Sequence, residues 1–238
     1  MILSGINFTL FFYLVKGKVK KALLDEELKW FLWSMLFFTV IITVTLIRTS
    51  PMGWEESFRK ALFQVSSLHT SAGFTSTDFM TWTPFLWTLL GIIMFLGACS
   101  GSTSEGIKSI RILILGKMIR NEFRHMIHPN AVLPVKVNKV VISSSVKKSV
   151  MTFILLYIVT FTVSWLIMTA MGVGSLEAFG TVISSMGGSG PGLGTCGPAG
   201  SWSTLPDAGK WFLSFLMLIG RLELFSVLII FTPPFWKK

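Results

Sequence analysis

The sequence is short of charge, cysteine and histidine, and each shortage disfavours a class of protein. Only 13% of its 238 residues are charged, whereas 52% are hydrophobic. A typical soluble domain carries about 25% charged residues. Cys99 lies in an apolar segment and Cys196 in a polar loop, so we expect neither a disulfide framework nor a zinc site. The sequence also contains no phosphate-binding loop and no metal-ligand cluster, and we expect no cofactor in this chain.

The long apolar runs predict an all-α polytopic membrane protein. A helix needs about 20 apolar residues to cross a bilayer, and we expect spans over 30–47, 150–171 and 210–231. The segment 84–119 is too long for one crossing, because 36 residues would make a helix of about 54 Å. Its polar, glycine-rich middle predicts two half-helices around a break. Residues 1–15 look like the tail of a preceding membrane helix.

One order of features occurs twice in the chain. A short helix expected over 55–68 ends on the glycine-centred stretch from His69 to Thr75, and an apolar segment follows. A second short helix, over 176–186, ends on a glycine-rich loop before the last span. An offset of 117 residues places Gly73 on Gly190. Internal repeats of this kind are typical of transport folds.

The two glycine loops have the chemistry of a cation path. A short helix that stops inside the membrane points its partly negative C-terminal end at the centre of the bilayer. Loop carbonyls can then replace the hydration shell of a small cation, and glycine permits the backbone angles that aim them at one axis. The alternative is that both loops are external turns between helices. The candidate carbonyls belong to Thr70, Ser71, Ala72, Gly73, Phe74, Gly187, Gly188, Ser189, Gly190 and Pro191.

The break in the segment 84–119 and a charged residue in the last expected span form a second group of candidate functional residues. We expect the break to line a cavity, although a glycine kink packed on other helices is the alternative. Arg221 lies within the last expected span, where a charge usually faces a bundle interior or a wet cavity. It could repel cations and anchor the break, or it could form a structural pair with Glu105 or Glu223. Helical spacing disfavours the pair with Glu223. The residues of the break are Gly101, Ser102, Thr103, Ser104, Glu105 and Gly106.

The basic residues predict which side of the membrane each segment faces. Sixteen of the 21 lysines and arginines lie in the opening, in the connector between Lys108 and Lys148, and in the tail with Lys237 and Lys238. The positive-inside rule puts these segments in the cytoplasm and both glycine loops outside. We therefore interpret the net charge of +10 as a topology signal and expect no nucleic acid. Acidic residues on the outer segments would raise the local cation concentration: Glu55, Glu56, Asp78, Glu177 and Asp207.

Only one motif in the sequence could suggest an enzyme, and it is weak. The stretch from Gly97 to Gly101, with Cys99 at its centre, has the glycine spacing of a nucleophile elbow. That motif needs a strand-to-helix turn and a positioned base, but here it interrupts a membrane segment. We expect His69 on the outer side, and His125 and His128 in the connector, to be polar-loop residues.

Four stretches together resemble the Trk/Ktr/HKT superfamily of potassium transporters, and especially its TrkH type. The resemblance covers nearly the whole chain and implies four membrane–pore-loop–membrane repeats around one pore. Residues 61–76 look like the third pore helix and filter, and 188–194 like the fourth filter. Residues 101–108 look like an intramembrane gating loop, and 220–223 like the last helix with its arginine.

The resemblance also implies roles and a division of the chain. Gly73 and Gly190 would be filter glycines, and Arg221 with the loop 101–106 would restrict permeation below the filter. Glu105 stands where the family pattern predicts a small residue. The implied division is 1–29, the end of a preceding repeat and a connector; 30–119, the third repeat; 120–148, a basic cytoplasmic connector; and 149–238, the fourth repeat.

By this resemblance the protein takes up potassium across a bacterial inner membrane and is not an enzyme. The implied partners are the lipid bilayer, a missing N-terminal half with two further repeats, and a TrkA-like cytoplasmic nucleotide-binding regulatory subunit. The full-length protein would form a homodimer. Two alternatives stay open at this point: a noncatalytic membrane scaffold or subunit of a transport complex, and a Na⁺/K⁺ transporter of the same family.

Overall fold

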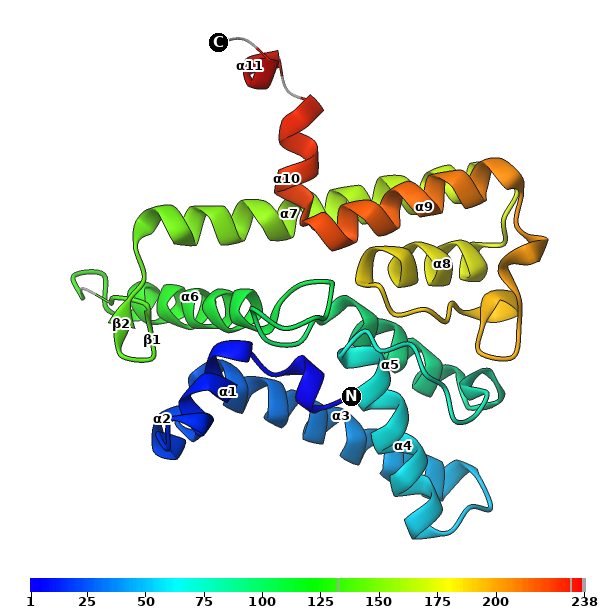
Figure 1. The fold of residues 1–238 in the computed structure, drawn as a ribbon, viewed down its shortest axis with the longest axis horizontal. Helices are drawn as coiled ribbons and strands as arrows, with labels where there is room; N and C mark the ends of the chain where they lie inside the picture. Colours follow the sequence, from blue (N-terminus) through cyan, green and yellow to red (C-terminus); the bar gives the residue numbers. More distant parts are fainter. Residues whose placement is uncertain (132, 232, 237–238) are drawn as a thin grey trace.

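The computed structural model describes residues 1–131, 133–231 and 233–236 (Figure 1). The tail lysines Lys237 and Lys238 lie outside the described residues. In chain order the helices are α1 (Phe8–Val15), α2 (Val19–Leu23), α3 (Glu26–Thr49), α4 (Trp54–His69), α5 (Pro84–Phe95), α6 (Ser109–Ile127), α7 (Ser144–Ala170), α8 (Ser175–Gly187), α9 (Asp207–Leu222), α10 (Leu224–Leu228) and α11 (Pro233–Trp236). The 3₁₀ turns and strands are η1 (Leu3–Gly5), η2 (Phe79–Thr81), η3 (Gly194–Cys196), η4 (Trp202–Thr204), η5 (Ile229–Phe231), β1 (Lys136–Val137) and β2 (Val140–Val141).

The helices form two groups that meet at α5. In the first group α3 packs on α4, and in the second α8 packs between α7 and α9. Helix α5 contacts both α4 and α8, so it joins the groups. Figure 1 shows α1 to α4 on one side and α7 to α9 on the other, with α6 continuing the line of α5 beyond a loop. Helix α4 runs inward from the outer edge, and the C-terminal ends of α4 and α8 both lie near the middle of the arrangement (Figure 1).

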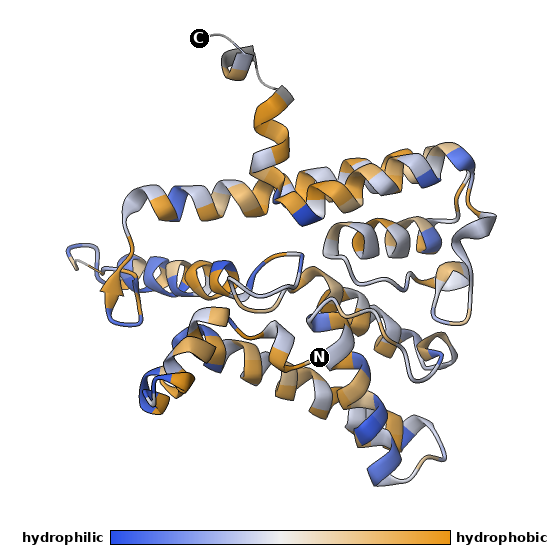
Figure 2. Cartoon of the chain, viewed as in Figure 1, coloured by the Kyte–Doolittle hydropathy of each residue, from blue (hydrophilic) through white to orange (hydrophobic). Residues whose placement is uncertain are grey.

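Two of the described helices, α3 and α7, are long and apolar enough to cross a membrane by length and composition. Both have a clear start, because the side chains of Asp25 and Ser143 accept hydrogen bonds from the first turns of α3 and α7. Large hydrophobic side chains are exposed along α7, among them Leu155, Val159 and Leu166. Figure 2 shows this helix as mostly hydrophobic.

The expected break in the segment 84–119 is present. Helix α5 ends at Phe95 and α6 begins at Ser109. Helix α6 continues to Ile127, so the connector expected from residue 120 begins as helix. This part of the chain lacks the glycine or proline that would end a helix before Pro129.

The connector also contains a β-hairpin that the sequence analysis did not predict. Strands β1 and β2 pair in antiparallel fashion across Asn138 and Lys139, whose φ angles are 49° and 67°. Two such angles are typical of a type I′ turn. The Asn138 side chain accepts from the Glu26 N–H at 2.9 Å and donates to Asp25 at 2.7 Å. The hairpin therefore docks on the start of α3.

The expectation of one continuous last span over 210–231 is wrong. Helix α9 ends at Leu222, and Glu223 follows with φ 62° and ψ 135°. Helix α10 then leaves in a new direction, away from the other helices (Figure 1). The opening segment also differs from a plain helix tail. Its α-helix begins only at Phe8, after Asn7 has capped it by accepting a hydrogen bond from Thr9.

Close packing makes one glycine of α8 a stability test. A Cβ on Gly180 would lie 2.3 Å from the backbone nitrogen of Leu193, and that atom cannot move aside easily. We expect Gly180→Ala to lower the free energy of unfolding by about 1–3 kcal/mol, as overpacking does. The matched control is Gly116→Ala in α6, because no described atom lies within 4 Å of a Cβ there. Thermal unfolding in detergent measures both, and equal melting temperatures would contradict the packing.

Candidate functional site

Helices α4 and α8 end in the same backbone conformation. Ser71 and Gly188, which are 117 residues apart, have φ angles of 55° and 61°. Two residues later, Gly73 and Gly190 have φ angles of 78° and 86°. Serine adopts this left-handed region only at a cost, so its presence at Ser71 indicates that the surroundings enforce the turn. The backbone geometry repeats at the offset that the sequence suggested.

The hydrogen bonds that end the two helices are also equivalent. The Ala72 N–H donates to the Ser67 carbonyl at 2.9 Å, and the Ser189 N–H donates to the Ser184 carbonyl at 3.1 Å. Both bonds span five residues and close over a left-handed residue, which is the Schellman arrangement of a helix C-terminus. Each short helix thus ends in a hydrogen-bonded turn, and the residues that follow it form a separate loop.

The two loops meet backbone to backbone. A Cβ built on Gly190 would lie 3.3 Å from the Cα of Gly73, and one built on Gly73 would lie 3.2 Å from the carbonyl oxygen of Ser189. Glycine is therefore favoured at both positions for two reasons, the positive φ and the tight contact that a Cβ would make. Segments that are 117 residues apart in the sequence form one continuous backbone surface here.

The Ser71 hydroxyl connects three parts of the chain. It donates to the carbonyl of Gly187 at 2.8 Å, at the end of α8. It also accepts from the backbone N–H of Glu105 at 3.2 Å, in the break between α5 and α6. One side chain therefore fixes the distance between the two glycine loops and holds the break against them.

The backbone of the break is hydrogen-bonded within the protein. Leu96 and Ile107 form a parallel bridge, in which Gly97 N–H donates to the Ile107 carbonyl at 2.8 Å and Ile107 N–H to Phe95 at 3.0 Å. The Ser104 hydroxyl accepts from Ala98 N–H at 2.9 Å. Irregular backbone at membrane depth is tolerated only where protein or a wet cavity satisfies it, and this break meets that condition.

The opening segment and one carboxylate also hold the break, and the sequence analysis missed both. Cys99 N–H donates to the Gly5 carbonyl at 3.0 Å, and Phe8 N–H donates to Gly101 at 3.3 Å. The Ser100 N–H donates to the carboxylate of Glu27, which is only 6% exposed. Glu27 stands in the first turn of α3, where acidic residues are common for helix-dipole reasons. Its sequence position therefore gave no sign of this long-range role.

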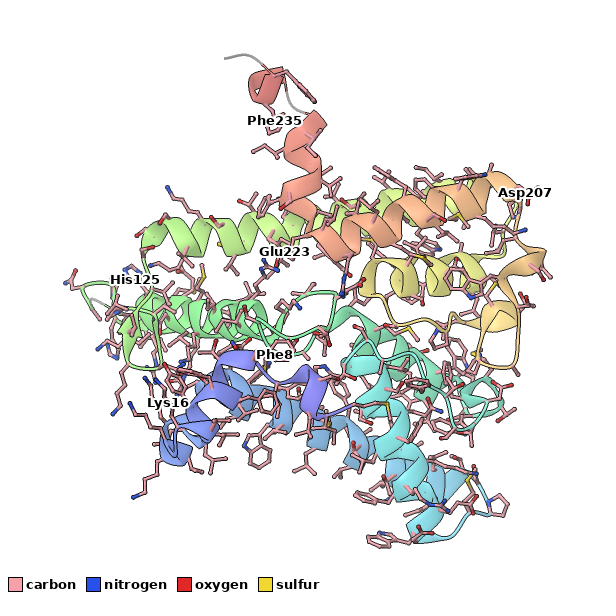
Figure 3. The ribbon with its side chains drawn as sticks, viewed as in Figure 1. Phe8, Lys16, His125, Asp207, Glu223 and Phe235 are labelled. Atoms are coloured by element: carbon pink, nitrogen blue, oxygen red, sulfur yellow. The ribbon has the colours of Figure 1, made fainter. Side chains whose placement is uncertain are left out.

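Two ion pairs connect the last helices to the break and to α6. The guanidinium of Arg221 donates to the Thr103 carbonyl at 3.0 Å and to Glu105 Oε1 at 3.3 Å. Arg221 thus pairs with Glu105, one of the two partners considered. Glu223 pairs instead with Arg111 at 3.0 Å, and the Arg111 guanidinium lies 3.8 Å from the centre of the Phe153 ring. Figure 3 shows Glu223 at the junction of α9 and α10.

A cavity of about 390 Å³ lies between the break, α7 and α9. Its wall contains the residues expected to line it, together with Arg221. From α6 and α7 come Arg111 and Tyr157, which the sequence analysis did not single out. The residues of the break in this wall are Gly101, Ser102, Thr103, Ser104, Glu105 and Gly106.

The structure places the residues of the two loops in different surroundings. Thr70 and Ser189 are buried, whereas the Phe74 side chain is 66% exposed. Gly190 is exposed and Pro191 is buried. The structure thus brings the two sets of loop residues together at Gly73 and Gly190, while Phe74 points its side chain away from the core.

The expectation that His69 is a polar-loop residue is wrong. Its side chain is 1% exposed and packs edge-on against Phe31, with ring centres 5.0 Å apart. Its Nε2 lies 3.0 Å from the Ser34 hydroxyl. His69 is the last residue of α4 and therefore turns into the α3–α4 contact. His125 and His128 are exposed, as expected of connector residues.

The described residues contain no group of three or more histidine, cysteine or acidic side chains that could hold a metal ion. Both cysteines are buried and free in this part of the chain. Burial raises the pKa of the Cys196 thiol, in the loop after α8. These surroundings favour the unreactive thiol over the thiolate.

Three of the acidic residues that the sequence analysis expects on the outer segments form ion pairs. Glu55 lies 3.0 Å from Arg59, and Glu56 lies 2.6 Å from Lys60, one helical turn away. The hydrogen bond from Lys60 lowers the pKa of the Glu56 carboxyl. Asp207 lies 3.1 Å from Lys210. Because nearby cations offset these charges, their attraction for distant cations is weaker than the sequence alone suggests.

Comparison with known proteins identifies close relatives. A family model described as TrkH, a cation transport protein, matches residues 1–238. The chain is 37% identical over 243 residues to the Trk system potassium uptake protein TrkH of Salmonella typhimurium, covering 100% of this chain and 49% of that protein. It is 38% identical over 242 residues to the protein of the same name from Vibrio parahaemolyticus, covering 100% of this chain and 50% of that protein.

A solved structure agrees with the observed fold. The crystal structure of the potassium transporter TrkH from Vibrio parahaemolyticus superposes with a TM-score of 0.92 at 37% identity, over 99% of this chain and 51% of that one. The chain therefore spans about half the length of the relatives it matches.

The Ser71 hydroxyl gives a direct test of the site geometry. We expect Ser71→Ala to lower the free energy of unfolding by about 1–3 kcal/mol, because the Gly187 carbonyl and the Glu105 N–H lose their partner. The matched control is Ser76→Ala in the same loop, which is exposed and should change stability by less than about 0.5 kcal/mol. Denaturation in detergent measures both. Equal stability of the two variants would show that Ser71 does not connect the loops.

Proposed function

Since the chain belongs to the TrkH family of cation transport proteins, we propose that it forms half of a potassium-uptake pore in a bacterial inner membrane. The family consists of membrane transporters, not enzymes. The chain spans about half the length of its relatives, so a second half with two further repeats would complete the pore. Two loops cannot enclose an ion by themselves.

The observation that carries this proposal is the meeting of Gly73 and Gly190. Both glycines have positive φ angles and follow equivalent turns at the ends of α4 and α8. The C-terminal ends of these helices carry a partial negative charge that favours a cation. The loop carbonyls supply oxygen ligands without a formal charge, as a potassium filter requires. The filter carbonyls on this proposal are those of Thr70, Ser71, Ala72, Gly73, Phe74, Gly188, Ser189, Gly190 and Pro191.

The break and Arg221 form the gate on this proposal. Arg221 is bonded to the Thr103 carbonyl and to Glu105, so its charge is fixed beside the break. A fixed guanidinium near the path raises the barrier for passing cations. The gate therefore consists of Gly101, Ser102, Thr103, Ser104 and Gly106 together with Arg221.

The remaining assignments follow from the sequence division. Residues 30–119 and 149–238 form two pore repeats. Residues 1–29 are the end of a preceding repeat and a cytoplasmic connector, and 120–148 are a basic cytoplasmic connector. The filter loops face outside, because the basic connectors favour the cytoplasm. The basic inner face offers a docking surface for a nucleotide-binding regulatory subunit of the TrkA type, and the full-length protein forms a homodimer. Potassium is the transported ion, and the chain holds no cofactor.

Growth on low potassium tests the proposed function. The full-length gene that contains this chain should restore growth of a strain deficient in potassium uptake. We expect Gly73→Ala to abolish growth or to lower K⁺-over-Na⁺ selectivity by at least about tenfold (~1.4 kcal/mol), because a Cβ strains the loop and contacts Ser189.

The matched control for this variant is Gly172→Ala. Gly172 has a φ of 85°, similar to that of Gly73, but no described atom lies within 4 Å of its Cβ, and it stands in a loop before α8. It should retain growth and selectivity. A full-length protein that folds but never supports growth would favour the scaffold alternative, and a Na⁺ flux equal to the K⁺ flux would favour the Na⁺/K⁺ transporter.

Replacing the arginine tests the gate. We expect Arg221→Ala in the full-length transporter to raise ⁸⁶Rb⁺ flux several-fold, because the variant removes a fixed positive charge and a bond to the break. The control is Arg59→Ala. The Arg59 side chain is 70% exposed, and among the described residues it forms an ion pair with Glu55 of the same helix. Unchanged flux and unchanged regulation in Arg221→Ala would remove this residue from the gate.

A further inference from the structure

The carboxylate of Glu105 has one oxygen committed to Arg221 and one oxygen that points elsewhere. Oε1 accepts from the guanidinium at 3.3 Å. Oε2 lies against the second glycine loop, since a Cβ built on Gly188 would be 2.4 Å from it. None of the described residues donates a hydrogen bond to Oε2. The Glu105 side chain as a whole is only 16% exposed.

A second polar group without a partner lines the same space. The hydroxyl of Ser184 is buried and has no hydrogen-bond partner among the described residues. Ser184, which is 2% exposed, lies in the last turns of α8. A cavity of about 650 Å³ is lined by Ser184, Glu105, Gly188, Gly190 and Arg221. Buried polar groups normally have partners, so the unpartnered Ser184 hydroxyl, in the wall of the same cavity as the Glu105 carboxylate, points to a ligand.

The chemistry of these groups selects a monovalent cation. Carboxylate and hydroxyl oxygens are hard ligands that suit hard cations. The guanidinium of Arg221 lies beside the Glu105 carboxyl group, and Glu105 is the only carboxylate among the described residues that line this cavity. Protein sites for Ca²⁺ usually gather several carboxylate and carbonyl oxygens. One carboxylate beside one guanidinium therefore suits a singly charged ion that keeps part of its water shell.

We propose that Glu105 and Ser184 form an inner site for a partly hydrated alkali cation, directly below the two glycine loops. Arg221 competes with the cation for the carboxylate. When an ion enters, Glu105 shifts its interaction from the guanidinium toward the ion, and when the ion leaves, the ion pair closes again. The site rests on the proposed function, because it receives ions that have passed the loops.

Anomalous scattering from Tl⁺, a potassium substitute, tests the site in crystals of the full-length transporter. The wild-type protein should show one Tl⁺ peak between the glycine loops and a second peak in contact with Glu105 and Ser184. Glu105→Gln, which keeps the shape and removes the charge, should lose the second peak and keep the first. The matched control is Glu122→Gln on the exposed side of α6, which should keep both peaks.

Transport kinetics provide a second measurement that does not depend on crystals. The half-saturating Rb⁺ concentration for uptake should rise about tenfold in Glu105→Gln, which is ~1.4 kcal/mol of lost binding. It should rise by a smaller factor in Ser184→Ala, a change that leaves the charge in place. The half-saturating Rb⁺ concentration of Glu105→Asp should lie between those of the wild type and Glu105→Gln.

The possible outcomes separate the two proposals. Tl⁺ between the loops with none at Glu105 in the wild type would overturn the inner site and leave the proposed function intact. Absence of Tl⁺ from between the loops, with no selective uptake, would overturn the proposed function. The Tl⁺ peak beside Glu105 and Ser184 could also survive in Glu105→Gln. If the half-saturating Rb⁺ concentration were then unchanged in Glu105→Gln and Ser184→Ala, these side chains would not hold the ion.

Discussion

The close approach of two backbone loops is the constraint on which the rest of the structure depends. Gly73 and Gly190 come so near that a Cβ on either one would be in tight contact with the backbone of the other loop. Polar backbone at such depth needs internal partners or water. The ends of α4 and α8 close their own hydrogen bonds, and the loops that follow meet backbone to backbone. The two helices α4 and α8 then serve to deliver these loops to one place.

The second requirement is that the two glycine loops and the break, which are polar, are held to one another among apolar helices. Ser71 joins both loops to the break, and Glu27 and the segment near Gly5 hold the break from the other side. The charged residues at the end of α9 form ion pairs, Arg221 with Glu105 and Glu223 with Arg111. Glu223 keeps an unusual φ of 62° while it pairs with Arg111. Such backbone strain costs about 1–3 kcal/mol and persists only where contacts enforce it.

Sequence patterns predicted the elements that depend on local periodicity. The expected ranges 30–47, 55–68, 150–171 and 176–186 lie within a few residues of α3, α4, α7 and α8. The break in the segment 84–119 followed from length and glycine content. The common offset of 117 residues reappears as equal backbone turns in the two loops. The ion-binding roles of these loops stay predictions.

Long-range contacts explain what the sequence could not predict. The residues 210–231 are apolar on both sides of Glu223, so hydropathy gave no sign of the turn between α9 and α10. The burial of His69 depends on Phe31 and Ser34 of another helix. Glu27 resembles any acidic residue at a helix start until Ser100 is placed beside it. In each case the decisive partner is distant in sequence.

The central claim is that backbone oxygens, and not side chains, select the ion. Replacing the amide of Phe74 by an ester weakens the Gly73 carbonyl as a ligand without changing a side chain. No described acceptor bonds the Phe74 N–H, so the ester removes no hydrogen bond. The account predicts that this single atom change in the full-length transporter lowers K⁺ conduction or K⁺-over-Na⁺ selectivity, whereas the same change at Ala199, between η3 and η4, does not. Conduction and selectivity that stay unchanged with the ester at Phe74 would contradict it.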